Sequence, residues 1–426
     1  KIDPHALSIY QTIPVEPIYQ TIITMETILA GDIGGTNSRF DLYQINTNEH
    51  QELISGKRAP GKLIFERQYM NCDFPTFNDV VRRFLEESGI SKPPITACLA
   101  VAGPVYNNSV EFTNRKEWKI VGEAVARTFG IRTVRLINDF VAVGYGLLTL
   151  NEDTECITLQ AAPKREGAPI ACIGAGTGLG ECYLTPSNMG QYACYPSEGG
   201  HTEYAPRSEL EIRLLGYLMK KFNANHRVSV ERVVSGTGLF NVYEFLSKEM
   251  PDKVDRNLHR EILDAGDMKG KIIATNQENE LCRLTMEIFA GAYGSEAGCA
   301  GLKWLPQAGL YITGGLTPKN IDLIRREDGP FLRAFKDKGR VSHMLNSVPV
   351  YAVMVEDMGR RGAHRTAFID FLSVEDINIF KRNVGSHEHV ATNLSKASSD
   401  SCGGCNANLC LAAAISAAMF IFAKYR

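Results

Sequence analysis

The stretch "LAGDIGGTNSRFDLY", residues 29–43, decides the fold. An apolar run leads into two adjacent glycines, and apolar side chains then return at every second position, as in Phe40 and Leu42. A period of two is the pattern of a half-buried strand, and no helix pattern follows the glycines. The stretch therefore predicts a strand, a tight Gly-Gly-Thr-Asn turn and a second strand. It matches neither the Walker-type phosphate loop nor the dinucleotide-binding glycine fingerprint.

Outward from this hairpin, the expected elements follow an order typical of a mixed sheet. A third strand is expected at 62–70, an amphipathic helix from Phe77, a buried strand at 95–103, a helix near 120–129 and a strand at 134–140. An antiparallel start followed by strands with helical crossovers favours an α/β fold with mixed sheets.

The hairpin has a partial repeat about one domain further along the chain. Residues 173–184, "IGAGTGLGECYL", again pass from a strand through a Gly-Thr turn into a strand. A third glycine pair, Gly314 and Gly315, also ends an apolar strand. Two similar lobes, each with a glycine hairpin, predict a central cleft between them.

These glycine turns indicate a nucleotide site. A turn with two glycines can point consecutive backbone N–H groups to one side, because no Cβ atom blocks the approach, and such a nest binds phosphate oxygens. One such turn could equally be a tight hairpin without a ligand, but three of them favour nucleotide binding.

Asp32 directly precedes the first turn. A carboxylate beside phosphates is tolerated when a divalent cation lies between them, so we expect Asp32 to hold Mg²⁺ indirectly, through water. The alternative is a strand-end aspartate that satisfies turn amides.

Polar side chains elsewhere could form the site of the phosphoryl acceptor. Asn138 and Asp139 follow an apolar strand, and Asp139 could simply cap the next helix. Its other possible role is that of a general base, since an aspartate with a pKa of about 3.9 is ionised at neutral pH. Glu198, His201 and Glu231 could share hydrogen bonds with the hydroxyls of a polyol. Each of them alone would more often be structural, and together they predict a sugar site.

The composition excludes other partners. The chain has 426 residues with 46 basic and 48 acidic ones, and it shows no basic footprint for nucleic acid. Its 11 cysteines are odd in number and the first eight have no framework spacing, so we expect reduced thiols and a cytoplasmic location. Residues 1–26 lack the pattern of a secretory signal and indicate an extended arm.

Together these motifs resemble those of the bacterial-type glucokinases, group A of the hexokinase family. The resemblance spans about residues 27–372 and keeps the family order. It is carried by "GDIGGTNSRFDLY", "AGPV", "FTN" with Trp118, "LINDFVAVGYG", "IGAGTGLG", "SEGGHTEYAP", "ERVVSGTGL", "YITGG" and "VPVYAVMVEDMGRRGA".

The resemblance implies a two-lobed, ribonuclease-H-like fold of the actin-like ATPase type. Its activity would be the phosphorylation of glucose at the 6-hydroxyl by ATP with Mg²⁺, the first step of glycolysis. The family also suggests a homodimer. Its small domain would comprise 27–139 plus 359–373, and its large domain 140–358.

The resemblance also assigns roles by position. Asp139 is expected to be the general base. The glucose hydroxyls are expected to contact Asn138, Asp139, Glu198, His201 and Glu231. ATP is expected to contact Gly31, Asp32, Gly34, Gly35, Thr36, Asn37, Gly176, Thr177, Gly178, Gly314 and Gly315.

The sequence disfavours three relatives of the same fold. The repressor and kinase branch carries a cysteine-rich zinc motif after the equivalent histidine, but no cysteine occurs between His201 and Cys282. A sugar-sensing repressor would need a basic helix-turn-helix ahead of the core, and residues 1–26 hold one lysine and no arginine. An actin- or chaperone-like ATPase would leave the acceptor side chains unexplained.

Residues 374–426 extend beyond the resemblance. "HEH" at 387–389 with "CGGC" at 402–405 could supply four zinc ligands, but the spacing is irregular. The apolar stretch 407–423 is at the short limit for a membrane span. Its alanines favour a docked or dimer-forming helix, so no membrane contact is expected.

Overall fold

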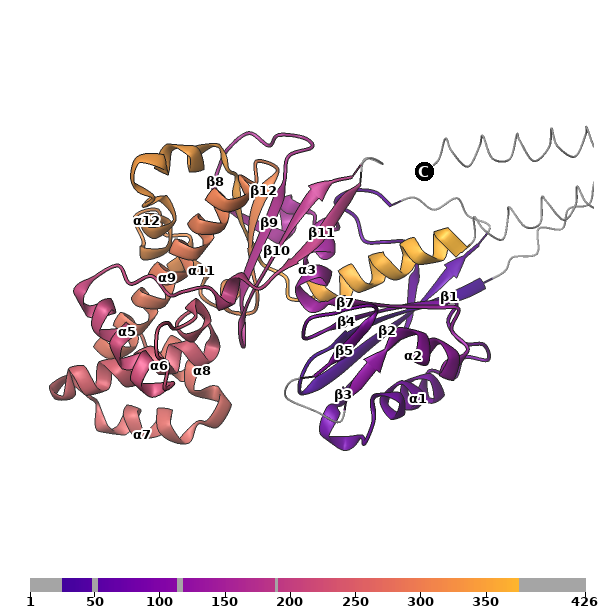
Figure 1. Cartoon of the computed structure of the whole chain (residues 1–426), viewed down its shortest axis with the longest axis horizontal. Coiled ribbons are helices and arrows are strands. Elements are labelled where there is room, and N and C mark those ends of the chain that lie inside the picture. Colours follow the sequence, from indigo (N-terminus) through magenta and orange to yellow (C-terminus); the bar gives the residue numbers. More distant parts are fainter. Residues whose placement is uncertain (1–24, 48–52, 113–117, 188–190, 375–426) are drawn as a thin grey trace, which may run out of the picture. The chain divides into compact units, whose positions relative to one another are not determined.

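Figure 1 shows the computed structural model of the chain, which describes residues 25–47, 53–112, 118–187 and 191–374. The described residues up to Asp370 belong to one compact unit. Residues 1–24 of the expected N-terminal arm, the HEH and CGGC motifs and the apolar stretch near the C-terminus lie outside the described residues. Met25 and Glu26, which were assigned to the arm, instead begin the first strand of the sheet. No helix among the described residues is long and apolar enough to cross a membrane.

The hairpin predicted at residues 29–43 is present and lies at the centre of a five-stranded sheet. The central strand β1 (Met25–Ile33) pairs antiparallel with β2 (Asn37–Asn46) and parallel with β4 (Thr96–Val101). β3 (Lys62–Met70) and β7 (Thr133–Asn138) form the two edges. The predicted mixed sheet is thereby confirmed.

Two helices cover one face of this sheet, α1 (Phe77–Ser88) and α2 (Gly122–Phe129). Thr76 begins α1 through a capping box with Asp79, and Gly89 ends it in the left-handed conformation. The helix buries the apolar stripe read from the sequence, formed by Phe77, Val80, Val81 and Phe84. The strand hairpin β5 (Ser109–Glu111) and β6 (Lys119–Val121) was not predicted.

A second, six-stranded sheet follows in the chain, with the order β11-β10-β9-β12-β13-β8. The repeated glycine hairpin is present as the antiparallel pair β9 and β10, and β12 runs parallel to both β9 and β13. This sheet is therefore mixed as well. Its strands are β8 (Cys156–Gln160), β9 (Ile170–Ala175), β10 (Leu179–Pro186), β11 (Tyr192–Ser197), β12 (Gly309–Thr313) and β13 (Val350–Val353).

Helices from the long segment between β11 and β13 pack together with the second sheet. The longest, α9 (Glu280–Trp304), contacts β9, α6 and α12 and is buried on most of its surface. The others are α5 (Glu209–Lys221), α6 (Gly236–Glu249), α7 (Arg256–Asp264), α8 (Lys269–Thr275), α10 (Leu316–Lys319), α11 (Ile321–Ile324) and α12 (Pro330–Lys336). The 3-10 segments include η1 (Asn71–Asp73), η2 (Gly199–His201), η3 (Val230–Arg232), η4 (Pro251–Lys253), η5 (Gly266–Met268) and the longer η6 (Gly339–Ser347).

The helix of residues 358–374 returns the chain to the first sheet (Figure 1, yellow). Thr96 Oγ1 of β4 donates to the Ala367 carbonyl at 2.9 Å. The His364 ring stacks on Tyr43 of β2 with 3.5 Å between centroids. These contacts place the helix on the face of the sheet opposite α1 and α2.

The helix α3 (Asp139–Leu147) contacts strands of both sheets, β4 and β7 of the first and β10 and β11 of the second. It also crosses the helix of residues 358–374 at close range. A Cβ on Gly362 would overlap the Ala142 carbonyl, and one on Gly146 would overlap the Met358 carbonyl. The crossing therefore depends on backbones that touch without side chains between them.

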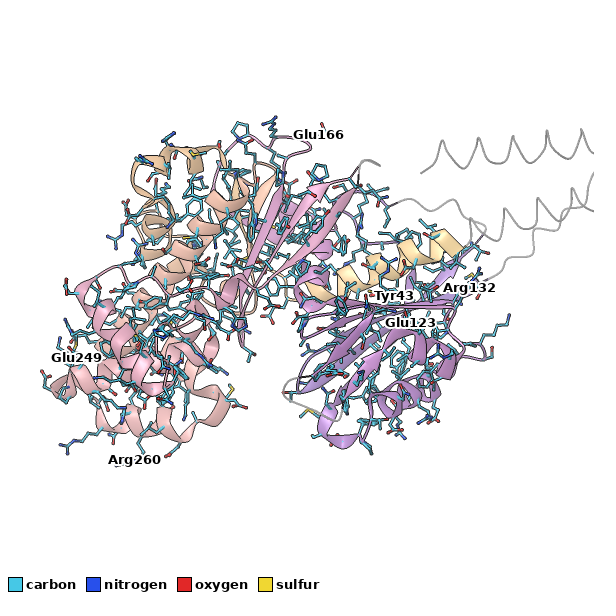
Figure 2. The ribbon with its side chains drawn as sticks, in the orientation of Figure 1. Tyr43, Glu123, Arg132, Glu166, Glu249 and Arg260 are labelled. Carbon is cyan, nitrogen blue, oxygen red and sulfur yellow. The ribbon has the colours of Figure 1, made fainter. Side chains whose placement is uncertain are left out.

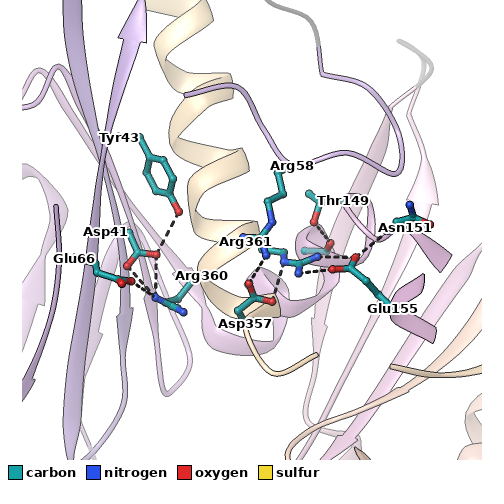
Figure 3. Close-up of polar contacts among 11 residues, drawn as sticks. Asp41, Tyr43, Arg58, Glu66, Thr149, Asn151, Glu155, Asp357, Arg360 and Arg361 are labelled. Carbon is teal, nitrogen blue, oxygen red and sulfur yellow. Dashed lines mark hydrogen bonds and ion pairs between the residues drawn. The ribbon is translucent and has the colours of Figure 1, made fainter. Parts of the chain in front are cut away.

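Two consecutive arginines at the start of the returning helix bind different parts of the molecule (Figure 3). Arg360 Nη1 lies 3.1 Å from Asp41 of β2 and 3.2 Å from Glu66 of β3. Arg361 Nη2 lies 2.6 Å from Glu155 at the end of α4 (Glu152–Glu155), the short helix that leads into the second sheet. The pair therefore links the first sheet to the entry into the second.

Candidate active site

The first glycine turn, between β1 and β2, is supported by Asn71, a residue that sequence reasoning missed. The Gly34 N–H donates to the Asn37 carbonyl at 2.9 Å, and Asn71 Nδ2 donates to the Gly34 carbonyl at 2.8 Å. The Asn71 N–H also donates to the Thr36 carbonyl at 2.8 Å. Within the described part of the chain, the N–H groups of Gly35 and Thr36 have no acceptor, and both residues are exposed. Such N–H groups can bind anionic oxygens.

Asp32 lies at the end of β1, directly opposite Arg39 in the hairpin. Its Oδ2 is 3.6 Å from Arg39 Nη1. Burial raises the pKa of the Asp32 carboxyl, an effect that Arg39 and Arg360 oppose. Mg²⁺ is commonly held by one or two carboxylates together with waters and phosphate oxygens. A half-buried carboxylate beside an exposed N–H turn fits a role in which Asp32 binds the ion through water.

Gly31, the neighbouring residue, lies inside β1 and is buried. A Cβ there would lie 2.7 Å from Leu99 Cδ2 and 3.3 Å from the Phe40 ring. In this structure Gly31 thus serves the packing of the sheet, two residues before the end of β1.

The second glycine turn joins β9 to β10 and is bonded to the start of α6. The Gly176 N–H donates to the Gly178 carbonyl, and the Gly236 N–H donates to the Gly176 carbonyl, both at 2.8 Å. Thr177 is exposed at the tip of the turn. A Cβ on Gly178 would lie 2.5 Å from Glu231 Oε2. The turn therefore touches one of the predicted sugar-binding carboxylates.

The third glycine turn follows β12 and adjoins the second. Gly314 has a φ of +82°, and a Cβ there would overlap the backbone of Ala175, the last residue of β9. The Tyr293 hydroxyl of α9 accepts from the Ala175 N–H at 3.1 Å and donates to the Thr313 carbonyl at 3.0 Å. One buried tyrosine thus fixes the two strand ends from which these turns start. Gly315 follows as the first, half-buried residue before α10.

Asn138, and not Asp139, is the cap of α3. Asn138 Oδ1 accepts from the N–H groups of Phe140 and Val141 at 2.9 and 3.2 Å. Its Nδ2 donates to the Gly103 carbonyl at 3.2 Å and to Asp139 Oδ1 at 3.0 Å. The capping role considered for Asp139 is thus filled by its neighbour, whose amide also orients the Asp139 carboxylate.

The Asp139 carboxylate lies near charges from both sides of the candidate site. Burial raises its pKa to about 6, and the negative charges of Asp32 and Glu198 add to that rise, while the Phe140 N–H opposes it. At neutral pH the group is mostly ionised, yet it is a stronger base than an ordinary aspartate. Asp32 comes from the end of β1 and Glu198 directly follows β11, so carboxylates from both sheets act on Asp139.

The predicted acceptor residues Glu198 and His201 lie at the two ends of the short turn η2, after β11. His201 Nε2 is 3.9 Å from Glu198 Oε2, and their side chains are 57% and 68% exposed. Accessible imidazole and carboxylate groups are suited to contact a hydroxylated ligand.

Glu231 is tied to the same region by backbone hydrogen bonds. The Tyr204 N–H donates to the Val228 carbonyl at 2.8 Å, and the Val230 N–H donates to the Thr202 carbonyl at 2.9 Å. Glu231 follows directly in η3, and its Oε2 accepts from the Leu179 N–H at 3.0 Å. Leu179 begins β10, so Glu231 is held against the strand that leaves the second glycine turn.

A cavity of about 290 Å³ lies beside these segments. Among the predicted site residues it includes His201 alone. It is lined by His201, Phe222, Ala224, Arg227, Val228, Ser229 and Arg232.

Comparisons with known proteins agree with this arrangement. The family model described as Glucokinase matches residues 29–368. A glucokinase of Synechocystis sp. is 41% identical over 351 residues, covering 79% of this chain and 96% of that protein. A glucokinase of Helicobacter pylori is 33% identical over 341 residues, covering 79% and 94% of the two chains.

Solved structures show the same fold. The crystal structure of a glucokinase from an Antarctic psychrotroph has a TM-score of 0.64 and 29% identity, with 80% of this chain and 99% of that chain covered. The glucokinase of Balamuthia mandrillaris, solved in complex with glucose, also has a TM-score of 0.64, with 20% identity and coverages of 82% and 95%. The actin-like ATPase fold expected from the sequence is thereby confirmed. From the family match and the extent of these identities, the chain belongs to the glucokinase family.

Proposed function

We propose that this member of the glucokinase family transfers the γ-phosphoryl group of ATP to the 6-hydroxyl of glucose, with Asp139 as the general base. The observation that carries the proposal is that the buried Asp139 carboxyl, oriented by Asn138, interacts with the negative charges of both Asp32 and Glu198, which raise its pKa. Asp32 directly precedes the glycine turn suited to phosphates, and Glu198 belongs to the segment suited to a sugar. A base at this junction can take the hydroxyl proton while the oxygen attacks phosphorus.

The three glycine turns are proposed to bind the nucleotide. The exposed N–H groups of Gly35 and Thr36 would contact phosphate oxygens, with the turn of Gly176, Thr177 and Gly178 opposite. Mg²⁺, held by Asp32 through water, would neutralise charge on the transferred phosphoryl group. Gly314 and Gly315 would border the adenosine.

The sugar hydroxyls are proposed to contact Asp139, Glu198, His201 and Glu231. Asn138 was assigned to the same task, but its amide already caps α3 and holds Asp139. A sugar contact from Asn138 would replace one of those hydrogen bonds. We therefore propose that Asn138 contributes chiefly by orienting the base.

Exclusion of water is part of the proposed mechanism. Water is far more concentrated than sugar and could accept the same phosphoryl group. Closure of a domain of residues 27–139 plus 359–373 onto a domain of residues 140–358 would align Asp139 with the γ-phosphate and remove solvent.

The test is an assay of ADP release that depends on the added sugar. We expect glucose to stimulate ADP release from ATP far above the rate with water alone. Mannose, fructose and glucosamine as acceptors, and pyrophosphate or polyphosphate as donors, would define the specificity. Equal ADP release with and without every sugar would contradict a hexose kinase and favour a simple ATPase.

We also propose that the protein is a cytoplasmic homodimer. This assembly is suggested by the family resemblance. Sedimentation of the full chain at micromolar concentration tests it, and a single species of 47.0 kDa, the mass of one chain, would rule out the dimer under those conditions.

A further inference from the structure

A buried carboxylic acid lies directly beneath the segment that carries Glu198 and His201. Glu181 in β10 is 0% exposed. Neither of its carboxyl oxygens has a hydrogen-bond partner within the described residues. An ionised carboxylate in such a place would lack both water and compensating donors, so the uncharged acid is strongly favoured.

The segment rests on Glu181 through a glycine. A Cβ on Gly199 would overlap both Oε1 and Oε2 of Glu181, and a Cβ on Gly200 would overlap the Leu179 carbonyl. The two glycines therefore lie flat against the first residues of β10. The same Leu179 donates its N–H to Glu231. A displacement at Glu181 would thus move the backbone that carries Glu198 and His201, and also Leu179, which is hydrogen-bonded to Glu231.

The ionisable groups that face Glu181 come from α9. Burial raises the pKa of Glu181 to about 8, Glu296 raises it further, and Lys303 opposes the rise. Lys303 Nζ is itself 3.4 Å from Glu296 Oε1, so its charge is shared with that carboxylate. Cys299 and Tyr293 of α9 are the other titratable groups that interact with Glu181.

The remaining elements around Glu181 offer no charge. Its neighbours across the sheet are Ile173 of β9 and Ser197 of β11. The ionisable side chains of the overlying segment, Glu198 and His201, are exposed. Within the described residues, Lys303 is therefore the one cation that acts on Glu181, and it is already paired.

We propose that Glu181 is a positioning residue, which as an uncharged acid supports the segment from Glu198 to His201 through Gly199, and whose ionisation displaces that segment and weakens sugar binding. The inference rests on the proposed function, because it takes Glu198 and His201 as sugar-binding residues. It adds a pH-dependent control of sugar binding that is separate from the ionisation of the general base, Asp139.

The expected effect follows the protonated fraction of Glu181. One pH unit above its pKa, about a tenth of the molecules keep the proton, so the apparent dissociation constant for glucose rises about tenfold. Asp139 titrates near pH 6 and affects turnover at the other end of the pH range. The two groups can therefore be separated by pH.

The experiment compares the wild type with Glu181→Gln and Glu181→Met, which cannot ionise. Glucose binding is measured by calorimetry between about pH 6.5 and 9.5. We expect the wild type to lose affinity above about pH 8 and both variants to keep it, while kcat changes less than KM. Glu166→Gln is the control, because Glu166 is exposed on a surface loop (Figure 2) and this variant should follow the wild type. An equal alkaline loss in all four proteins would overturn the proposal.

A second measurement needs no sugar. Hydrogen–deuterium exchange of the peptide that covers residues 198–201 is compared between the wild type and Glu181→Gln at the same alkaline pH. We expect the wild type to exchange at least several times faster, and equal rates would overturn the displacement. If no glucose binds at any pH but exchange differs as expected, the proposed function fails while the role of Glu181 in holding the segment stands.

Discussion

At the scale of single residues, Asp139 combines two conditions that a general base requires. It is oriented by Asn138, and its pKa is raised to about 6 by burial and by neighbouring carboxylates. Asp139→Ala should lower kcat by about 10²–10⁴-fold, the usual contribution of a positioned base. Glucose affinity should change less than about tenfold, because the other sugar contacts remain. Steady-state kinetics with calorimetry checks both, and near-native turnover would show that another group is the base.

The pH dependence gives an independent check on Asp139. A base acts in its ionised form, so kcat/KM should fall about tenfold per pH unit below about pH 6 and level off between about pH 6 and pH 8, where Glu181 is still uncharged. In Asp139→Asn the remaining activity should lose this acid limb. An unchanged limb would assign it to a different residue.

Gly178 allows a close contact that a larger side chain cannot. A Cβ there would lie 2.5 Å from Glu231 Oε2. Gly178→Ala should therefore displace the Glu231 carboxylate and raise KM for glucose by about tenfold. Gly216→Ala serves as the control, since Gly216 lies on α5 with no atom within 4 Å of an added Cβ. Equal KM values for glucose in the two variants would show that Glu231 does not contribute to sugar binding.

The sequence could predict those site residues whose chemistry is marked by a local pattern. Asp139 at a strand exit and the three glycine turns are of this kind, and the structure places them at strand ends as expected. Asn71 and Glu181 carry no such mark. Asn71 becomes important because β3 brings it under the first turn, and Glu181 because α9 and η2 bury it. Both conditions depend on segments distant in the chain.

At the scale of elements, the contact between α3 and the helix of residues 358–374 is set by glycine. A Cβ on Gly362 would overlap the Ala142 backbone, so the two helices would have to separate. Gly362→Ala should lower the free energy of unfolding by about 1–3 kcal/mol, as expected for overpacking. Urea unfolding measures it. Gly291→Ala on α9 is the matched control, because its added Cβ meets no atom and should be neutral or stabilising.

Elements with a clear period were predictable and short ones were not. The strand at residues 62–70 and the helix from Phe77 have the predicted positions, because alternation and a 3.6-residue stripe extend over several residues. β5 and β6 have three residues each, too few to show a period. Their hairpin is stabilised by tertiary packing around the buried Trp118.

At the scale of the whole molecule, Arg361 links segments that are about two hundred residues apart. Its side chain is 4% exposed and lies 2.6 Å from Glu155 and 2.8 Å from Asp357. Arg361→Met would leave Glu155 with only the Asn151 N–H and Asp357 with only the exposed Arg58, and should cost about 3 kcal/mol of unfolding free energy. Arg325→Met removes an exposed pair with Asp322 and should cost less than about 1 kcal/mol. If chemical denaturation gave equal losses of unfolding free energy for the two variants, the buried Arg361 pairs would stabilise the fold no more than an exposed ion pair.

The return of residues 358–374 to the first sheet has a consequence for synthesis on the ribosome. More than two hundred residues separate β7 from this helix. At about 5–20 residues per second, translation of that interval takes on the order of ten seconds or more. During this time the face of the N-terminal sheet that this helix later covers is exposed and apolar. A chaperone at the exit tunnel would bind this exposed apolar surface, and a chain that ends before residue 358 would leave it uncovered and prone to aggregation.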